Sequence, residues 1–198
     1  NPSYYEKGLP YLDRLNILVV GEELTRVALF RLKKVDLIES PPDRFGDIRK
    51  NHPDTEFLLY KEAGTGLEIA LKTTVSPLDN LQVRKAVFSA LDPWNAIDTV
   101  WNGLGFVSLG MPVADPGWLL PDEELRNYLA NPSRARDLLA AAPQNPSPSF
   151  TLTVADYGDT YLEYGRRLAQ QLEAVGFQVS LSIINPTDYP QEVWYGGR

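Results

Sequence analysis

Cysteine is absent from the 198-residue sequence, and histidine occurs once, as His52. Without a thiol the chain cannot form a disulfide, a zinc–thiolate site or a cysteine nucleophile. A single histidine leaves little room for a histidine-based catalytic triad or a multi-histidine metal site. We interpret His52 as a surface residue of the turn that it forms with Pro53. We therefore expect no metal ion and no cofactor.

Long apolar runs and an excess of positive charge are also missing. No run approaches the roughly 20 residues of a membrane-spanning helix, and no signal-peptide pattern is present. The formal net charge is −7, from 19 basic and 26 acidic residues, whereas nucleic-acid-binding domains usually carry a basic patch. We expect no nucleic-acid partner. The opening residues, Asn-Pro-Ser-Tyr-Tyr, suggest the interior of a chain, so we interpret the sequence as an internal fragment of a longer protein.

The residues that are present indicate a globular protein with many short connections. Hydrophobic residues make up 43% of the chain and charged residues 23%, which is ordinary for a soluble domain. A chain of this length can bury roughly 70% of its unfolded surface. The 16 prolines and 14 glycines follow no period, so they mark turns rather than a repeat.

The most strongly patterned stretch runs from Pro77 to Gly103 and predicts two helices. Asp79 or Asn80 is a suitable helix cap, and an apolar stripe of helical period follows it. Asp92-Pro93 is then typical of a second helix start. The residues expected to face inward are Val83, Ala86, Val87, Ala90 and Leu91 in the first helix, and Ile97, Val100 and Trp101 in the second.

Strands and helices alternate through the rest of the chain. Short apolar or alternating runs predict strands at 16–20, 35–38, 56–60, 67–73, 150–154 and 177–184. Amphipathic periodicity and capping residues predict further helices at 21–34, 41–50, 131–142, 160–175 and, less regularly, 185–195. Leu24, Val27, Ala28, Leu29 and Leu32 form the expected inner face of the first of these helices. This pattern predicts an α/β fold.

The order of these segments resembles the family 5 extracellular solute-binding proteins, the peptide, dipeptide and nickel receptors of ABC importers. The central stretch resembles the family's Pro-Phe-x-Asp-x-x-Val-Arg-x-Ala helix and the Asp-Arg-x-x-Ile helix after it. The matching residues in the central stretch are Pro77, Asp79, Val83, Arg84, Ala86, Asp92, Ile97 and Gly103. Those at the start of the chain are Asn1, Pro2, Tyr4, Gly8, Pro10, Tyr11, Leu12 and Asp13. A later helix matches at Asn131, Pro132, Ala135, Leu138, Leu139 and Ala142, and the segment near the end at Leu172, Gly176, Val179, Leu181 and Tyr189.

The resemblance implies the type II, dipeptide-binding-protein type of periplasmic-binding-protein-like fold, with mixed sheets flanked by helices. Intact members are more than twice as long, so the chain would form a partial two-lobe structure. Residues 1–75 would be the C-terminal portion of the larger lobe and residues 76–198 most of the second lobe. In this family the ligand lies between two lobes that close on it.

The same resemblance places a ligand-binding site at two segments. One is the start of the strand at 67–73, with Gly66, Leu67 and Glu68; the other is the region around the loop after the second helix, with Trp101, Phe106 and Met111. Most of these residues fit a position in the core, or in a loop packed on its own domain, as well as they fit a ligand contact. The family commonly has ligand-facing aromatics at the strand start, where this chain has Gly66 and Leu67, so the ligand stays open between peptide, nickel chelate, sugar and opine.

The resemblance implies a solute-binding component of an ABC importer that captures an oligopeptide outside the cytoplasmic membrane and delivers it to the permease. We expect a monomer, anchored as a lipoprotein in the intact protein and extracellular or periplasmic, with no catalytic activity. One alternative is the ligand-sensing domain of a cytoplasmic transcription regulator with the same fold. The other is an enzyme using the carboxylates of Glu22-Glu23 or Asp122-Glu123-Glu124. These runs are more typical of helix starts, where the helix dipole favours acids, than of a buried acid with a raised pKa.

Overall fold

The computed structural model describes residues 4–40, 44–58, 67–108, 116–142 and 147–196. It divides into two compact units, unit 1 (Asn1–Glu56) and unit 2 (Phe57–Arg198). The predicted lobe boundary, between Val75 and Ser76, lies later in the chain than the division between these two units. Residues before that boundary, Ile69 and Leu71, pack against the core of unit 2. The assignment of residues to lobes stays a prediction.

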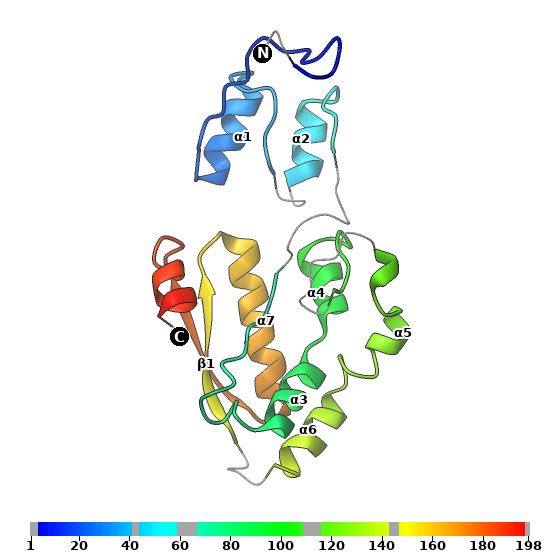
Figure 1. Cartoon of the computed structure of the whole chain (residues 1–198), viewed down its shortest axis with the longest axis vertical. Helices are drawn as coiled ribbons and strands as arrows, with labels where there is room; N and C mark the ends of the chain where they lie inside the picture. Colours follow the sequence, from blue (N-terminus) through cyan, green and yellow to red (C-terminus); the bar gives the residue numbers. More distant parts are fainter. Residues whose placement is uncertain (1–3, 41–43, 59–66, 109–115, 143–146, 197–198) are drawn as a thin grey trace. The chain divides into compact units, whose positions relative to one another are not determined.

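Unit 1 contains two short helices, α1 (Glu23–Arg31) and α2 (Phe45–Asn51), which Figure 1 shows in blue and cyan. Polar contacts join them: Arg44 Nε donates to Glu23 Oε1 over 2.9 Å, and Arg31 pairs with Asp47. His52 is the C-cap residue of α2, and its ring lies edge-on to Phe30 at a centroid distance of 6.2 Å. The predicted surface turn is therefore a half-buried helix end.

Unit 2 is built on a strand–helix–strand unit. Strand β1 (Ser149–Ala155) leads into α7 (Asp159–Val175), which returns the chain to β2 (Gln178–Ile184). The strands pair in parallel, with Ser149 opposite Gln178 and Ala155 opposite Ile184, as a helical crossover requires. Gly176 ends α7 in the left-handed conformation, which glycine adopts without strain. All three elements match their predicted positions to within about one residue.

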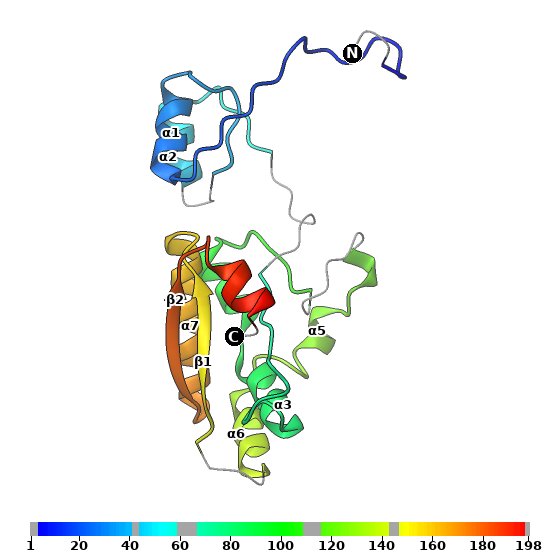
Figure 2. The same ribbon diagram turned by 60° about the vertical axis from the view of Figure 1, so that its left-hand side comes forward.

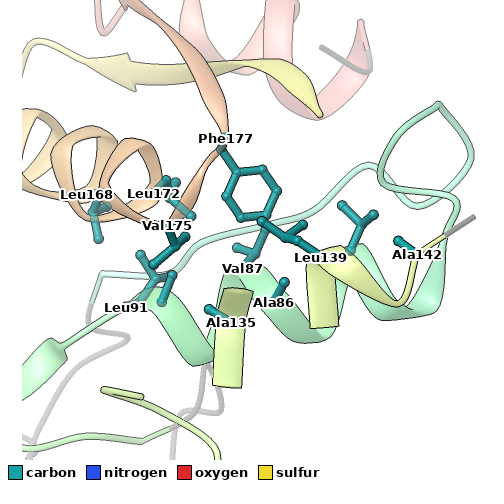
Figure 3. Packing of buried hydrophobic residues seen from close by; sticks show 12 residues of the cluster. Ala86, Val87, Leu91, Ala135, Leu139, Ala142, Leu168, Leu172, Val175 and Phe177 are labelled. Atoms are coloured by element: carbon teal, nitrogen blue, oxygen red, sulfur yellow. The ribbon is translucent and has the colours of Figure 1, made fainter. Parts of the chain in front are cut away.

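The main core of unit 2 lies where α7 meets α3 (Leu81–Ala90) and α6 (Pro132–Ala140). Figure 3 shows Phe177, the residue before β2, pointing toward Val87 of α3 and Leu139 of α6. Asn80 caps α3 by accepting hydrogen bonds from the backbone of Gln82 and Val83. The predicted inner face of α3 is confirmed. The core residues are Val83, Ala86, Val87, Ala90, Leu91, Ala135, Leu139, Ala142, Leu168, Leu172, Val175 and Phe177.

A second, smaller apolar cluster joins α4 (Pro93–Val100) to α5 (Asp122–Leu125). It contains Val107, Leu125 and Leu129, with Trp94 and Ile97 packed against it. Trp94 Nε1 donates to Asp122 Oδ2 over 2.7 Å, and the Arg126 guanidinium lies 4.1 Å from the centre of the Trp94 ring. Two short elements complete the unit, a 3₁₀ turn at Pro116–Trp118 and a π-helical turn at Pro190–Tyr195.

Several predicted elements are wrong or shorter than expected. The described residues of the predicted strands at 16–20, 35–38, 56–60 and 67–73 form no strand. Backbone ladders need a partner strand, and within the described ranges only β1 and β2 pair. The alternation at 67–73 is partly correct in its facing, because Ile69 and Leu71 are half-buried while Glu68, Ala70 and Lys72 are exposed, but Leu67, expected on the inner face, is 40% exposed. The helix predicted at 185–195 is reduced to the π-helical turn.

The predicted inner face of α1 is also only partly correct. Val27 is buried, but Leu24 and Leu32 are 61% and 68% exposed. A two-helix unit of this size offers little apolar surface against which a wide stripe can pack.

Replacing Val87 with Asp tests the placement of the core. We expect unit 2 to lose several kcal/mol of stability, because an unpaired carboxylate would be buried between α3 and α6. Since domain stability is typically about 5–15 kcal/mol, thermal unfolding should shift strongly or vanish. Phe88→Asp is the matched control, because Phe88 is the next residue and is 42% exposed. Equal melting curves for both variants would contradict the assigned face.

Replacing Gly165 with Ala tests the contact between α7 and β1. An ideal Cβ on Gly165 would lie 2.7 Å from Val154 Cγ2, so overpacking should cost about 1–3 kcal/mol despite a helix-propensity gain of about 1 kcal/mol. Gly46→Ala in α2 is the control, since a Cβ there meets nothing within 4 Å. Denaturant unfolding should show a loss for the first variant only; an unaffected Gly165→Ala protein would refute the close approach.

Candidate ligand-binding site

The carboxyl ends of β1 and β2 form an edge that we call the carboxyl edge, residues 156–161 and 185–189. In parallel sheets with crossover helices, ligands bind outside the carboxyl ends of the strands. The backbone N–H of Asp156 donates to the carbonyl of Ile184 over 2.9 Å, which ties the two loops together. Figure 2 shows β1, β2 and α7 from the side. This edge is where the fold of unit 2 favours a small-molecule site.

Each loop of the carboxyl edge is ordered by its own side chains. Asp156 Oδ1 accepts from the backbone of Gly158 over 3.2 Å, and Gly158, at φ +108°, turns the chain into α7. Asn185 Oδ1 accepts from the backbone and hydroxyl of Thr187 over 3.0 and 2.8 Å. Asp159 and Asp188 add negative charge. The edge therefore carries negative charge, which favours a cationic ligand group over an anionic one.

Aromatic side chains lie along the first turns of α7 at the same edge. Tyr157 and Tyr161 have ring centroids 5.4 Å apart, and Tyr164 stands one turn further on. Trp101, which follows α4, meets the Tyr164 ring edge-on at 5.0 Å. Exposure falls along this aromatic row, from 57% for Tyr157 to 37% for Tyr161 and a mostly buried Tyr164. Burial raises the pKa of the Tyr164 hydroxyl. The exposed end of the row can stack on flat or apolar ligand groups.

The sequence-predicted site residues fall into three groups. Trp101 joins the aromatic row, and Phe106 lies on the following loop and is 38% exposed. Leu67 and Glu68 are exposed on a separate extended segment, so their membership of one site with Trp101 stays a prediction. Gly66 and Met111 lie outside the described residues.

The tyrosines of the carboxyl edge were not predicted from the sequence. Their spacing, at positions 157, 161 and 164, is a helical i, i+4, i+7 pattern directly after a strand. Read together with the parallel pairing of β1 and β2, that spacing would have pointed to this edge. Tyr189 and Trp194, whose rings meet at 6.0 Å, form a second pair after β2, and Trp194 is 70% exposed.

Neither of the acidic runs has the environment of a catalytic acid. Glu22 caps α1, accepting from the backbone of Leu24 and Thr25, and the hydroxyl of Thr25 lowers its pKa. Asp122, Glu123 and Glu124 are exposed in the first turn of α5. The described residues hold no cluster of three potential metal-binding side chains. None of the described helices is both long and apolar enough to cross a membrane.

The fold is that of ligand-binding proteins with known structures. The binding protein AgaA of A. tumefaciens R10, solved with agropinic acid, superposes with a TM-score of 0.79 at 25% identity, over 98% of this chain and 39% of that one. A dipeptide-binding protein of Pseudoalteromonas sp. SM9913, solved with Met-Leu, superposes with a TM-score of 0.68 at 16% identity, over 91% of this chain and 36% of that one. The class is thus the type II periplasmic binding proteins, as predicted.

Sequence comparison identifies the family. The profile described as "Bacterial extracellular solute-binding proteins, family 5 Middle" matches residues 1–197. Heme-binding protein A of Haemophilus influenzae is 34% identical over 139 residues, which are 70% of this chain and 25% of that protein. Di/tripeptide-binding protein 1 of Pseudomonas aeruginosa is 26% identical over 175 residues, 87% of this chain and 32% of that protein. The chain belongs to the family 5 bacterial extracellular solute-binding proteins and spans about a quarter to a third of these two relatives.

The Glu22 cap gives a prediction with a defined pH dependence. Because the folded-state pKa of Glu22 is lowered, its contribution to α1 is present above the unfolded-state pKa and is lost as pH falls through the folded value. The protection factors of the Leu24 and Thr25 amides, measured by NMR in acid as the intrinsic exchange rate divided by the observed rate at each pH, should fall over that window. Glu22→Gln should remove the window and Glu39→Gln should leave it; a Glu22 that titrates at or above the ordinary glutamate pKa would contradict the prediction.

Proposed function

We propose that this chain is part of the solute-binding component of an ABC importer, with oligopeptides as its solutes. The observation that carries the proposal is the family match along residues 1–197. The component captures its ligand outside the cytoplasmic membrane, acts as a monomer, is anchored as a lipoprotein and delivers the ligand to a permease. Its chemistry is binding without turnover, since neither acidic run is placed for acid–base work.

A peptide ligand agrees with the chemistry of the carboxyl edge. Asp156, Asp159 and Asp188 favour a free ammonium group, while Tyr157 and Tyr161 offer ring faces to side chains of many kinds. Two of the relatives support this choice, the di/tripeptide-binding protein of Pseudomonas aeruginosa and the binding protein solved with Met-Leu.

Heme is the second candidate, because the relative with 34% identity is a heme-binding protein. A planar macrocycle would use the exposed ring faces of Tyr157 and Tyr161 without needing the aspartates. The two candidates therefore differ in which side chains of the carboxyl edge they require.

A binding titration with the complete gene product tests the function and separates these ligands. The panel is Met-Leu, heme, agropinic acid and Ni(L-His), measured by calorimetry. We expect micromolar or tighter binding of Met-Leu, weakened about tenfold by Tyr161→Ala, since one aromatic contact is worth about 1 kcal/mol or more. Tyr128→Ala is the control, because Tyr128 lies between α5 and α6 beside Arg134.

The outcomes are distinct. Binding of heme but not Met-Leu would replace the peptide proposal, and binding of nothing in the panel would refute both candidates. A helix-turn-helix domain upstream, without an export signal, would favour the cytoplasmic regulator instead. The 198-residue chain alone should bind weakly or not at all, because the remainder of the cleft would come from the rest of the protein; a saturable micromolar titration of this chain would contradict that.

A further inference from the structure

The described part of the loop that follows α4, residues 101–108, is held at two points. At its start the chain reverses through Asn102 and Gly103, with φ of 52° and 75°. The backbone N–H of Gly103 donates to the carbonyl of Ile97 over 3.0 Å, and that of Leu104 to the carbonyl of Trp101 over 2.9 Å. These hydrogen bonds end α4. The direction of the loop after it is set by the side chains on either side of the chain reversal.

The first of these side-chain anchors is Trp101. Its ring meets Tyr164 edge-on, with centroids 5.0 Å apart and planes at 69°, a favoured geometry for aromatic pairs. Tyr164 in turn packs against the main core of unit 2. Trp101 is therefore held by a side chain that is itself held by α7, and Figure 1 shows α4 alongside α7.

The second anchor is Val107, which is buried with Leu125 and Leu129 in the smaller cluster. Trp94 packs against that cluster, and its Nε1 donates a hydrogen bond to Asp122. Gly105 passes close to α4, where an ideal Cβ would lie 3.4 Å from Ile97 Cγ1. Between Gly105, which lies against Ile97, and the buried Val107, Phe106 is 38% exposed.

We propose that Tyr164 is a positioning residue that holds Trp101 and thereby presents Phe106 to the bound solute. The proposal rests on the proposed function and adds to it a residue that does not itself touch the solute. Tyr164 acts through its ring, so phenylalanine should replace it and an aliphatic side chain should not. If Tyr164 only filled the core, its replacement would affect unit 2 as a whole and not the loop after α4 in particular.

Hydrogen exchange and tryptophan emission of the complete gene product test the positioning. We expect Tyr164→Leu to accelerate hydrogen exchange at the amides of Gly103 and Leu104 at least tenfold, while exchange within α6 is unchanged. The emission of Trp101, isolated by subtracting the spectrum of a Trp101→Phe partner, should shift to the red. Tyr164→Phe should behave as the parent, and Tyr128→Leu is the control for loss of a tyrosine elsewhere in the unit.

Binding of Met-Leu by the complete gene product tests the consequence. Tyr164→Leu and Phe106→Ala should each weaken binding about tenfold, and the double variant should be no weaker than Phe106→Ala alone, because residues acting through one contact are not additive. Tyr164→Phe should restore parental affinity.

Each outcome decides the proposal. Unchanged exchange at Gly103 and Leu104, additive losses, or equal damage from phenylalanine would overturn it. If Tyr164→Leu fails to fold, Trp101→Leu removes the other ring of the same pair, outside the main core, and must produce the same exchange pattern. If the parent binds no solute in the panel, the proposed function fails and the role in presenting Phe106 to a solute fails with it, while the exchange and fluorescence results still establish whether Tyr164 holds the loop.

Discussion

The packing of α7 between β1 and the α3–α6 pair is the constraint on which the rest of unit 2 depends. Gly165 allows the helix to approach Val154 closely, and Leu168, Leu172 and Val175 bury the helix against the main core. Because the helix is fixed in this way, its first turns have a fixed position relative to the carboxyl ends of the strands. Stability and site geometry thus have one origin, and the glycine contributes to both by leaving room for the strand.

The core of unit 2 was predictable because its information is local. A cap, a stripe of helical period and a terminating glycine are each contained within one segment, as in α3 with Asn80 or α7 with Gly176. Strands are different, because an apolar run such as 16–20 specifies a strand only if another segment supplies its hydrogen-bond partners. In the described structure Val19 is 97% exposed, and the run 16–20 pairs with no strand. Periodicity predicted the apolar character of such segments and could not predict their pairing.

The candidate site was predicted less well than the fold, for a related reason. Trp101 and Phe106 were chosen from one loop, and that loop does reach α7. The ring partner of Trp101, Tyr164, is separated from it in sequence by strand β1, and only the parallel pairing of β1 with β2 identifies the start of α7 as a candidate site edge. That pairing is what places Tyr157 and Tyr161 at the candidate site. A residue pattern alone cannot separate an exposed aromatic pair from a tyrosine-rich core face.

Rigidity near the carboxyl edge affects both the affinity and the selectivity of a binding protein. Fixing side chains before the ligand arrives lowers the conformational entropy that binding must offset, and the Trp101–Tyr164 contact together with the buried Val107 supplies that fixing to the loop after α4. The side chains left exposed, Tyr157, Tyr161 and Phe106, present ring faces and no buried polar groups. Ring faces discriminate weakly among apolar groups, whereas unpaired buried polar groups reject ligands strongly. In the proposed site, side chains of this kind would favour a class of solutes over a single one, and the charged groups Asp156, Asp159 and Asp188 would be the expected source of selectivity.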